Sequence, residues 1–168
     1  MIMLLLMTVL SLLVFQLGKV NLIIVNNAQH RIQGLSAAQA AIEAVVSSPT
    51  FLTKPLGAIS QPCQGVPNRT CADIDANGTG DLVVAVTPTC LSTHVIPVPL
   101  LDYSDASDVS CLVGANQETG INGVSANRSL CASMLWDVQA VATDEIMQSE
   151  LVVNQGTSVR AEAFITCP

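Results

Sequence analysis

The chain opens with a long run of apolar residues. Met1–Leu17 carries no charged side chain, and Gly18 and Lys19 close the run. A helix over this run would be about 26 Å long, slightly short of the ~30 Å hydrocarbon core of a membrane. Leu22–Val25 extends the apolar character past Lys19, whose long side chain is able to snorkel to an interface. The pattern predicts a helix inserted in lipid or in a protein assembly.

The apolar run passes directly into an amphipathic segment. Its apolar residues recur at steps of three and four and mark one face of a helix: Ala28, Ile32, Leu35, Ala38, Ile42 and Val45. The first proline is Pro49, so we expect one helix from near Met1 to about Ser48, about 72 Å long. Gly18 is its expected weak point. The second half of this helix is rich in alanine, which permits close approach of a neighbouring helix.

Two simpler interpretations compete with an assembling helix. A cleaved signal peptide would show a basic start and a small-residue cleavage site. No Lys or Arg precedes the apolar run, Gln16-Leu17-Gly18 is a poor cleavage site, and the helical pattern continues beyond it. A plain single-pass anchor with a helical stalk is the second alternative.

Proline and glycine become frequent from Thr53 onward, and the helical periodicity stops. Valine-rich, partly alternating segments predict four strands: Leu82–Thr87, His94–Leu100, Leu135–Thr143 and Glu150–Phe164. Pro97 and Pro99 indicate that the second is an edge strand, and Gly156 is a candidate break that would turn the last into a hairpin. We expect an α+β fold in which a stem (1–52) precedes a head (53–168). The head would be an antiparallel sheet laid on the helix, with Trp136 in its core.

Charge divides the chain in the same way as hydrophobicity. Half of the residues are hydrophobic and 11% are charged. Residues 1–54 carry a net charge of +2 and the remainder −9, which gives −7 overall. A head this acidic repels nucleic acid and anionic lipid, so we expect neither as a partner of that surface. Asp102, Asp105 and Asp108 form an acidic loop that we expect to be solvated.

All six cysteines lie in the head: Cys63, Cys71, Cys90, Cys111, Cys131 and Cys167. An even number without a C-x-x-C pattern indicates a disulfide framework rather than a zinc site. Persistent disulfides imply an oxidising compartment, so we expect the head to lie outside the cytoplasm. Six cysteines allow 15 pairings, of which Cys63–Cys71 is favoured because the two are close in sequence.

One string in the head has the spacing of a calcium loop. Its candidate ligands are Asp73, Asp75, Asn77, the Thr79 carbonyl and Asp81, with Gly78 at the tight turn. Val84 stands where such loops carry a bidentate glutamate, so the site would be incomplete by itself. The alternative is a plain Asx-rich turn before the Leu82 strand. Three Asn-x-Ser/Thr sequons begin at Asn68, Asn77 and Asn127. A glycan on Asn77 would exclude calcium from the loop.

No catalytic motif is found in the sequence. It lacks a G-x-S-x-G nucleophile, an H-E-x-x-H pair and a phosphate-binding glycine loop. We expect His30 and His94 to be structural or exposed, and no cofactor is predicted besides the candidate calcium.

The stem resembles the N-terminal helix of type IV pilins and pseudopilins, in particular that of PilX-like minor pilins. The resemblance covers residues 1–50 and includes an "AA-x-EA" stretch, which reads Ala40-Ala41-Ile42-Glu43-Ala44 here. Many pilins carry Glu at the fifth position, where this chain has Leu5. The resemblance also implies a Cys131–Cys167 disulfide that ties the C-terminus to the sheet.

The resemblance implies a structural subunit of an extracellular filament at the cell surface, reached through a membrane-inserted precursor. Its partners would be copies of itself and an inner-membrane assembly machinery. The expected packing residues are Leu6, Leu10, Leu13 and Leu17. The alternatives are a minor pilin that binds a surface or another cell through its head, and a membrane-anchored extracytoplasmic enzyme or inhibitor.

Overall fold

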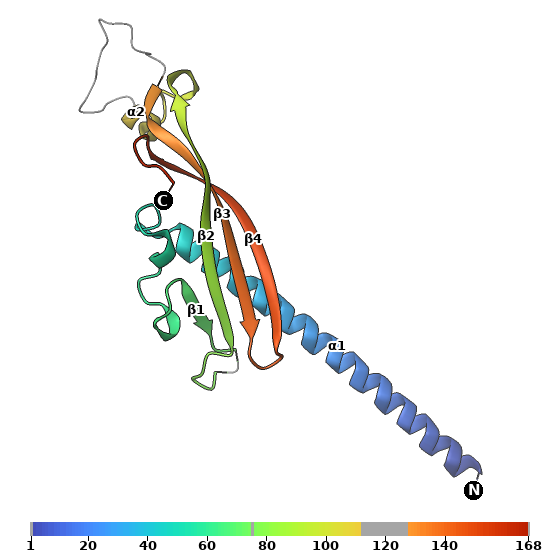
Figure 1. The fold of residues 1–168 in the computed structure, drawn as a ribbon. Helices are drawn as coiled ribbons and strands as arrows, with labels where there is room; N and C mark the ends of the chain where they lie inside the picture. The colour runs from blue at the N-terminus through green and yellow to red at the C-terminus, as the bar shows by residue number, and fades with distance from the viewer. Residues whose placement is uncertain (1, 75, 112–127, 168) are drawn as a thin grey trace, which may run out of the picture.

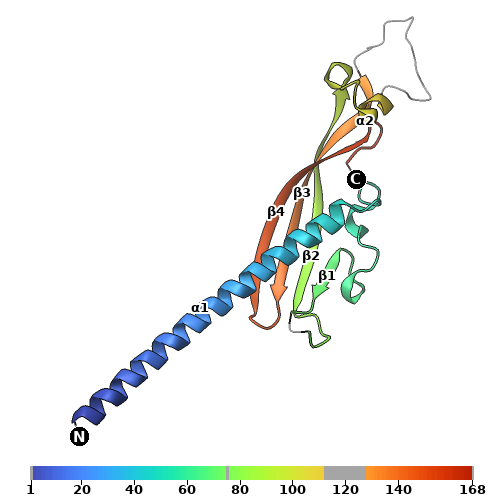
Figure 2. The same ribbon diagram turned by 180° about the vertical axis from the view of Figure 1, so that it is seen from behind.

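The computed structural model describes residues 2–74, 76–111 and 128–167. One long helix, α1 (Ile2–Val46), runs into an elongated head built on a four-stranded sheet (Figure 1). The second half of α1 lies across one face of the sheet, whereas its first half projects beyond it (Figure 2). The predicted α+β layout is confirmed.

The predicted single helix is confirmed almost to its ends. α1 passes through Gly18 as regular helix, so the expected weak point does not interrupt it. The helix stops just before Pro49, which has no amide hydrogen to continue the backbone hydrogen bonds. From His30 onward α1 is partly buried, and its most buried residues are Ala38, Ala41, Ile42 and Val45.

The sheet is antiparallel throughout, in the order β1-β2-β3-β4. Its strands are β1 (Arg69–Ala72), β2 (Leu82–Pro97), β3 (Arg128–Asp144) and β4 (Ser149–Glu162). Alternate side chains of β3 are buried, as expected for a strand whose one face lies against the core: Ala132, Met134, Trp136, Val138, Ala140 and Ala142.

Two strand predictions are wrong because each divides a strand that is continuous in the structure. The two segments at Leu82–Thr87 and His94–Leu100 form one strand, β2, and only Val98–Leu100 leaves it, as the 3-10 helix η3. β4 is likewise continuous through Gly156, which lies opposite Asp137. The prolines of β2 are tolerated because β1 pairs with β2 only through Leu82–Ala85. Beyond that point β2 has one strand neighbour among the described residues, so its prolines lie at a sheet edge.

The core joins the end of α1 to the centre of the sheet. Phe51, just after the helix, packs on Trp136 with ring centroids 4.8 Å apart at 52°. Both rings are about 1% exposed, and Ile42 and Val45 lie in the same cluster. Such an aromatic pair contributes about 0.5–1.5 kcal/mol beyond its buried area. The predicted core position of Trp136 is confirmed.

A buried asparagine fixes the segment between α1 and β1. Asn68 Oδ1 accepts a hydrogen bond from Ala58 N–H at 2.9 Å, and Asn68 Nδ2 donates to the Pro55 carbonyl at 2.6 Å. The Asn68 backbone has φ +51°, a conformation that asparagine tolerates better than most residues. Its side chain is therefore occupied and 2% exposed, which closes this sequon to a glycan in the folded protein.

The acidic loop is only partly solvated. Asp105 caps α2 (Ala106–Ser110), and the N–H and hydroxyl of Ser107 hold the pKa of Asp105 below its usual value. Asp108, by contrast, is 7% exposed and forms an ion pair with Arg160 of β4. The expectation of a fully solvated loop is therefore wrong for Asp108, since α2 turns this carboxylate towards the sheet.

Every cysteine is oxidised, and the predicted Cys63–Cys71 bond is present. The other two bonds are Cys90–Cys167 and Cys111–Cys131, so the Cys131–Cys167 bond implied by the resemblance is wrong. Leu130 N–H donates to the Cys111 carbonyl at 2.9 Å, which brings the end of α2 beside the start of β3 and gives Cys131 a nearer partner. The C-terminal segment instead reaches the middle of β2.

Removing the Cys90–Cys167 bond should destabilise the head more than removing the Cys63–Cys71 bond. The two bonds close loops with sequence separations of 77 and 8. Loop-closure entropy assigns them about 4.5 and about 2.5 kcal/mol respectively. Urea unfolding of the two double Cys→Ser variants in detergent would measure the difference in free energy of unfolding.

Proteolysis without reduction provides the control. It should release linked peptides for the three pairs described above, and a peptide joining Cys131 to Cys167 would contradict the structure. Equal stability losses in the two double variants would contradict the loop-length argument.

Candidate assembly surface and helix–sheet junction

The first half of α1 carries an apolar surface that no other described element covers. The four expected packing residues are exposed by 61% (Leu6), 63% (Leu10), 55% (Leu13) and 67% (Leu17). The most apolar window of α1 has a mean hydropathy of 2.0 and no buried residue. By length and composition, α1 is able to cross a membrane. An exposed apolar surface of this size marks a contact with lipid or protein.

Only the later part of the predicted apolar face of α1 is buried. The predicted face continues correctly through Ala38, Ile42 and Val45, which are buried against the sheet. Its earlier members Ile32 and Leu35 are exposed by 67% and 41%. They precede or face away from the sheet, so they extend the uncovered apolar surface towards the head.

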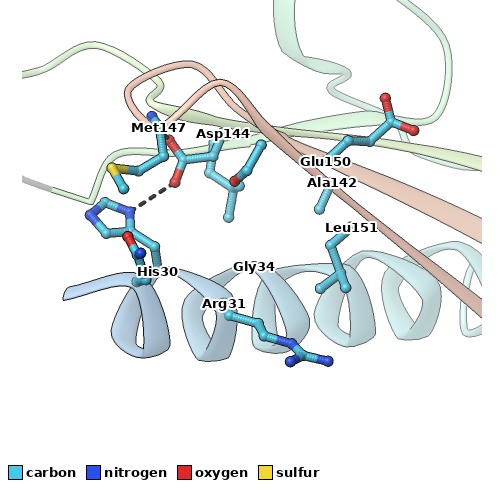
Figure 3. Close-up of a pocket in the computed structure, with 11 residues that line it drawn as sticks. His30, Arg31, Gly34, Ala142, Asp144, Met147, Glu150 and Leu151 are labelled. Carbon is cyan, nitrogen blue, oxygen red and sulfur yellow. Dashed lines mark hydrogen bonds and ion pairs between the residues drawn. The ribbon is translucent and has the colours of Figure 1, made fainter. Parts of the chain in front are cut away.

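A polar contact marks the place where α1 leaves the sheet. His30 of α1 and Asp144 at the end of β3 meet with Nδ1 and Oδ2 2.8 Å apart (Figure 3). Their side chains are 16% and 5% exposed. A carboxylate only accepts hydrogen bonds, so the contact places a proton on Nδ1 of His30. The bond fixes the level at which the stem emerges from the head.

Asp144 is held by the turn that follows it as well as by the helix. Its Oδ1 accepts the N–H groups of Ile146 and Met147, each at 2.9 Å. Burial alone would raise the pKa of Asp144, but the bonds from Met147, His30 and Ile146 outweigh it and lower the pKa. The carboxylate therefore stays charged inside the junction and ties the β3–β4 turn to α1.

An open cavity of about 570 Å³ lies beside this contact, between α1 and the β3–β4 hairpin. Its lining residues include the apolar Leu82 and Leu151 and the ionisable Arg31, Asp144 and Glu150. Helix and strand come close here: a methyl group at Gly34 would lie 3.7 Å from Leu151 Cδ2.

The candidate calcium loop forms a turn in which side-chain oxygens accept hydrogen bonds from the backbone N–H groups of the loop. Gly78 adopts φ +88°, the tight turn expected of it. Asp73, Asn77 and Asp81 each accept backbone N–H groups of the loop at 2.7 to 3.2 Å. Asp75 lies outside the described residues. Within the described part of the chain no group of three or more His, Cys, Asp or Glu is arranged for a metal, and calcium stays a prediction.

The sequence contains a second helical pattern that marks the helix–sheet junction, and the apolar face predicted above does not include it. His30, Gly34, Ala38, Ala41 and Val45 are spaced by four, four, three and four, so they share one helix face. A polar residue at the start of a buried stripe indicates a specific partner. The identity of that partner, 114 residues away, was not readable from the pattern.

Replacing Asp144 with alanine should destabilise the junction by about 2–4 kcal/mol. The variant removes the acceptor of three part-buried hydrogen bonds, and their donors lose this partner. The folded-state pKa of Asp144 lies below the unfolded value of about 3.9. Its contribution is therefore complete above that value and disappears as the pH falls through the lowered pKa. Urea unfolding of both proteins between neutral and acidic pH would follow this loss.

The neighbouring Glu145→Ala variant is the matched control, because Glu145 is exposed and carries the same charge. Its free energy of unfolding should stay within about 0.5 kcal/mol of the original protein. A gap between Asp144→Ala and the original protein that stays constant down to the most acidic pH would contradict the proposed role of the carboxylate.

The described residues thus offer a bare apolar helix and a hydrogen-bonded junction that fixes it to the head. Comparison with protein family models, curated proteins and solved structures finds no match to this chain.

Proposed function

We propose that this chain is a structural subunit of a type IV pilus-like extracellular filament and polymerises through the first half of α1. The observation that carries the proposal is the division of one continuous helix. Its second half belongs to the core of a disulfide-bonded head, whereas its first half is apolar and uncovered. The N-terminal resemblance to type IV pilins supports the same function.

Bundling of the stems is physically reasonable because each stem needs an apolar environment. Apolar area removed from water contributes about 25 cal/mol per Å², so a free stem in water is strongly disfavoured. In a membrane the lipid already covers this surface, so assembly must exploit close helix packing and an energy-driven extrusion machinery. The disulfides support a location outside the cytoplasm for the head.

A minor subunit that binds a surface through its head is the second candidate. Three large apolar side chains are exposed in segments around η3 and after β4: Leu100 by 74%, Tyr103 by 63% and Phe164 by 79%. Figure 1 places these segments away from the N-terminus of α1. The copy number of the chain in isolated filaments distinguishes the two: a filament made mainly of this chain supports the first, and rare copies support the second.

Replacing Leu10 or Leu13 with aspartate should reduce filaments at least about a hundredfold. A charge left unpaired in an apolar interface costs about 3–5 kcal/mol. Electron microscopy of sheared surface material, with peptide identification of this chain, would measure the loss. The three disulfides of the head should still form, since neither leucine contacts the head.

Leu100→Asp is the matched control, because Leu100 is also an exposed leucine but belongs to the head. It should leave filament number unchanged. A double Leu10→Ala/Leu13→Ala variant, which keeps the stem apolar enough to insert, separates a packing defect from failed insertion. Normal assembly of the aspartate variants, or an original protein found only as a monomer in lipid, would refute the filament proposal.

A further inference from the structure

Lys19 is an isolated charge in the stem. It is the only Lys, Arg, Asp or Glu among residues 1–30, and it lies on the exposed part of α1 between apolar segments. When stems pack together, water is withdrawn from its ammonium group, which is costly unless an opposite charge replaces the water. Copies packed level with one another would place their Lys19 side chains together and repel. The stem therefore needs an acidic partner from a copy displaced along the axis.

Few acidic groups are placed to meet such a stem. α1 itself offers Glu43 alone. At the end of the head from which α1 emerges, Asp144 already accepts three hydrogen bonds, and Asp73 and Asp81 accept backbone N–H groups of their own loop. Glu145 is exposed in the β3–β4 turn and is tested below as a control. Glu150 lies on the rim of the junction cavity, at the start of the edge strand β4, and is exposed.

Glu150 is available to a neighbouring copy. Figure 3 shows its carboxylate directed away from α1, and the Arg31 guanidinium directed away from the sheet. Among the described residues Glu150 makes no ion pair with Arg31 or with any other cation. β4 has no strand beyond it in the described sheet, so a second stem is able to approach Glu150 from the side.

The length of the apolar stem distinguishes Glu150 from Glu43. Leu151, the neighbour of Glu150, packs on Gly34, so pairing with Lys19 displaces two copies by about 22 Å along the helix axis. Ile2–Val25 is about 36 Å long, and this displacement leaves about 14 Å of apolar overlap. Pairing Lys19 with Glu43 requires about 36 Å, which leaves no overlap. Of these two arrangements, only the pairing with Glu150 keeps the apolar segments in contact.

We propose that Lys19 of one copy forms an ion pair with Glu150 of a second copy and thereby sets the axial register of the assembly. This inference rests on the proposed filament function and names the contact that aligns its subunits. The charge complementarity fits the wider division of the molecule into a basic stem and an acidic head.

Charge reversal tests the pair in the full chain. Lys19→Glu should lower filament yield at least about tenfold, because it sets two carboxylates against each other. The double variant Lys19→Glu/Glu150→Lys should restore assembly. In original filaments a zero-length carbodiimide cross-linker should join Lys19 to Glu150, and mass spectrometry of the linked peptides would identify the bond.

Glu43→Lys and Glu145→Lys, each combined with Lys19→Glu, are the matched controls. Rescue by Glu43→Lys would overturn the register, and rescue by Glu145→Lys would overturn the choice of partner. Filaments of Lys19→Glu at normal yield would refute the ion pair while leaving the filament function intact. Absence of filaments from the original chain would instead refute the filament function itself.

Discussion

The close approach of α1 to the central strand β3 is the contact on which the rest of the structure depends. Small side chains on one face of the helix, Ala38 and Ala41, allow its backbone to lie near the sheet. The buried side of β3 fills the space opposite, and Trp136 meets Phe51 where the helix ends. Because this core is shared between helix and sheet, neither part has a complete apolar interior without the other.

A shared core has a mechanical consequence for the stem. An anchor joined through a flexible linker would leave the head free to reorient, but here the helix is continuous from the bare segment into the core. The His30–Asp144 hydrogen bond also holds the helix to the sheet at the level where the helix leaves the head. In the proposed filament, the axial position of a stem would therefore determine where its head lies, and a register set by one ion pair would be transmitted to the surface.

The part of the sheet beyond the end of α1 is stabilised differently. No described helix of comparable length covers it, and it has fewer buried apolar side chains. Two disulfides act there: Cys111–Cys131 holds α2 to the start of β3, and Cys90–Cys167 holds the C-terminal segment to β2. The Asp108–Arg160 ion pair joins α2 to β4 in the same region. Covalent and ionic links thus supplement a thin core, as is common in small extracellular domains.

The sequence by itself determined the local features: the long helix, its termination before Pro49, the β-rich head and the Cys63–Cys71 bond. Each depends on residues near one another in the chain, where periodicity and short loop closure are informative. Tertiary structure alone decided that β2 and β4 run unbroken, because tolerance of Pro88 or Gly156 depends on whether a strand lies alongside. It also paired Cys90 with Cys167 and brought Asp144 to His30 across 114 residues. The uncovered apolar surface of α1 was predicted as a stripe of leucines, but its boundary was not, since only the position of the sheet shows where the helix ceases to be covered.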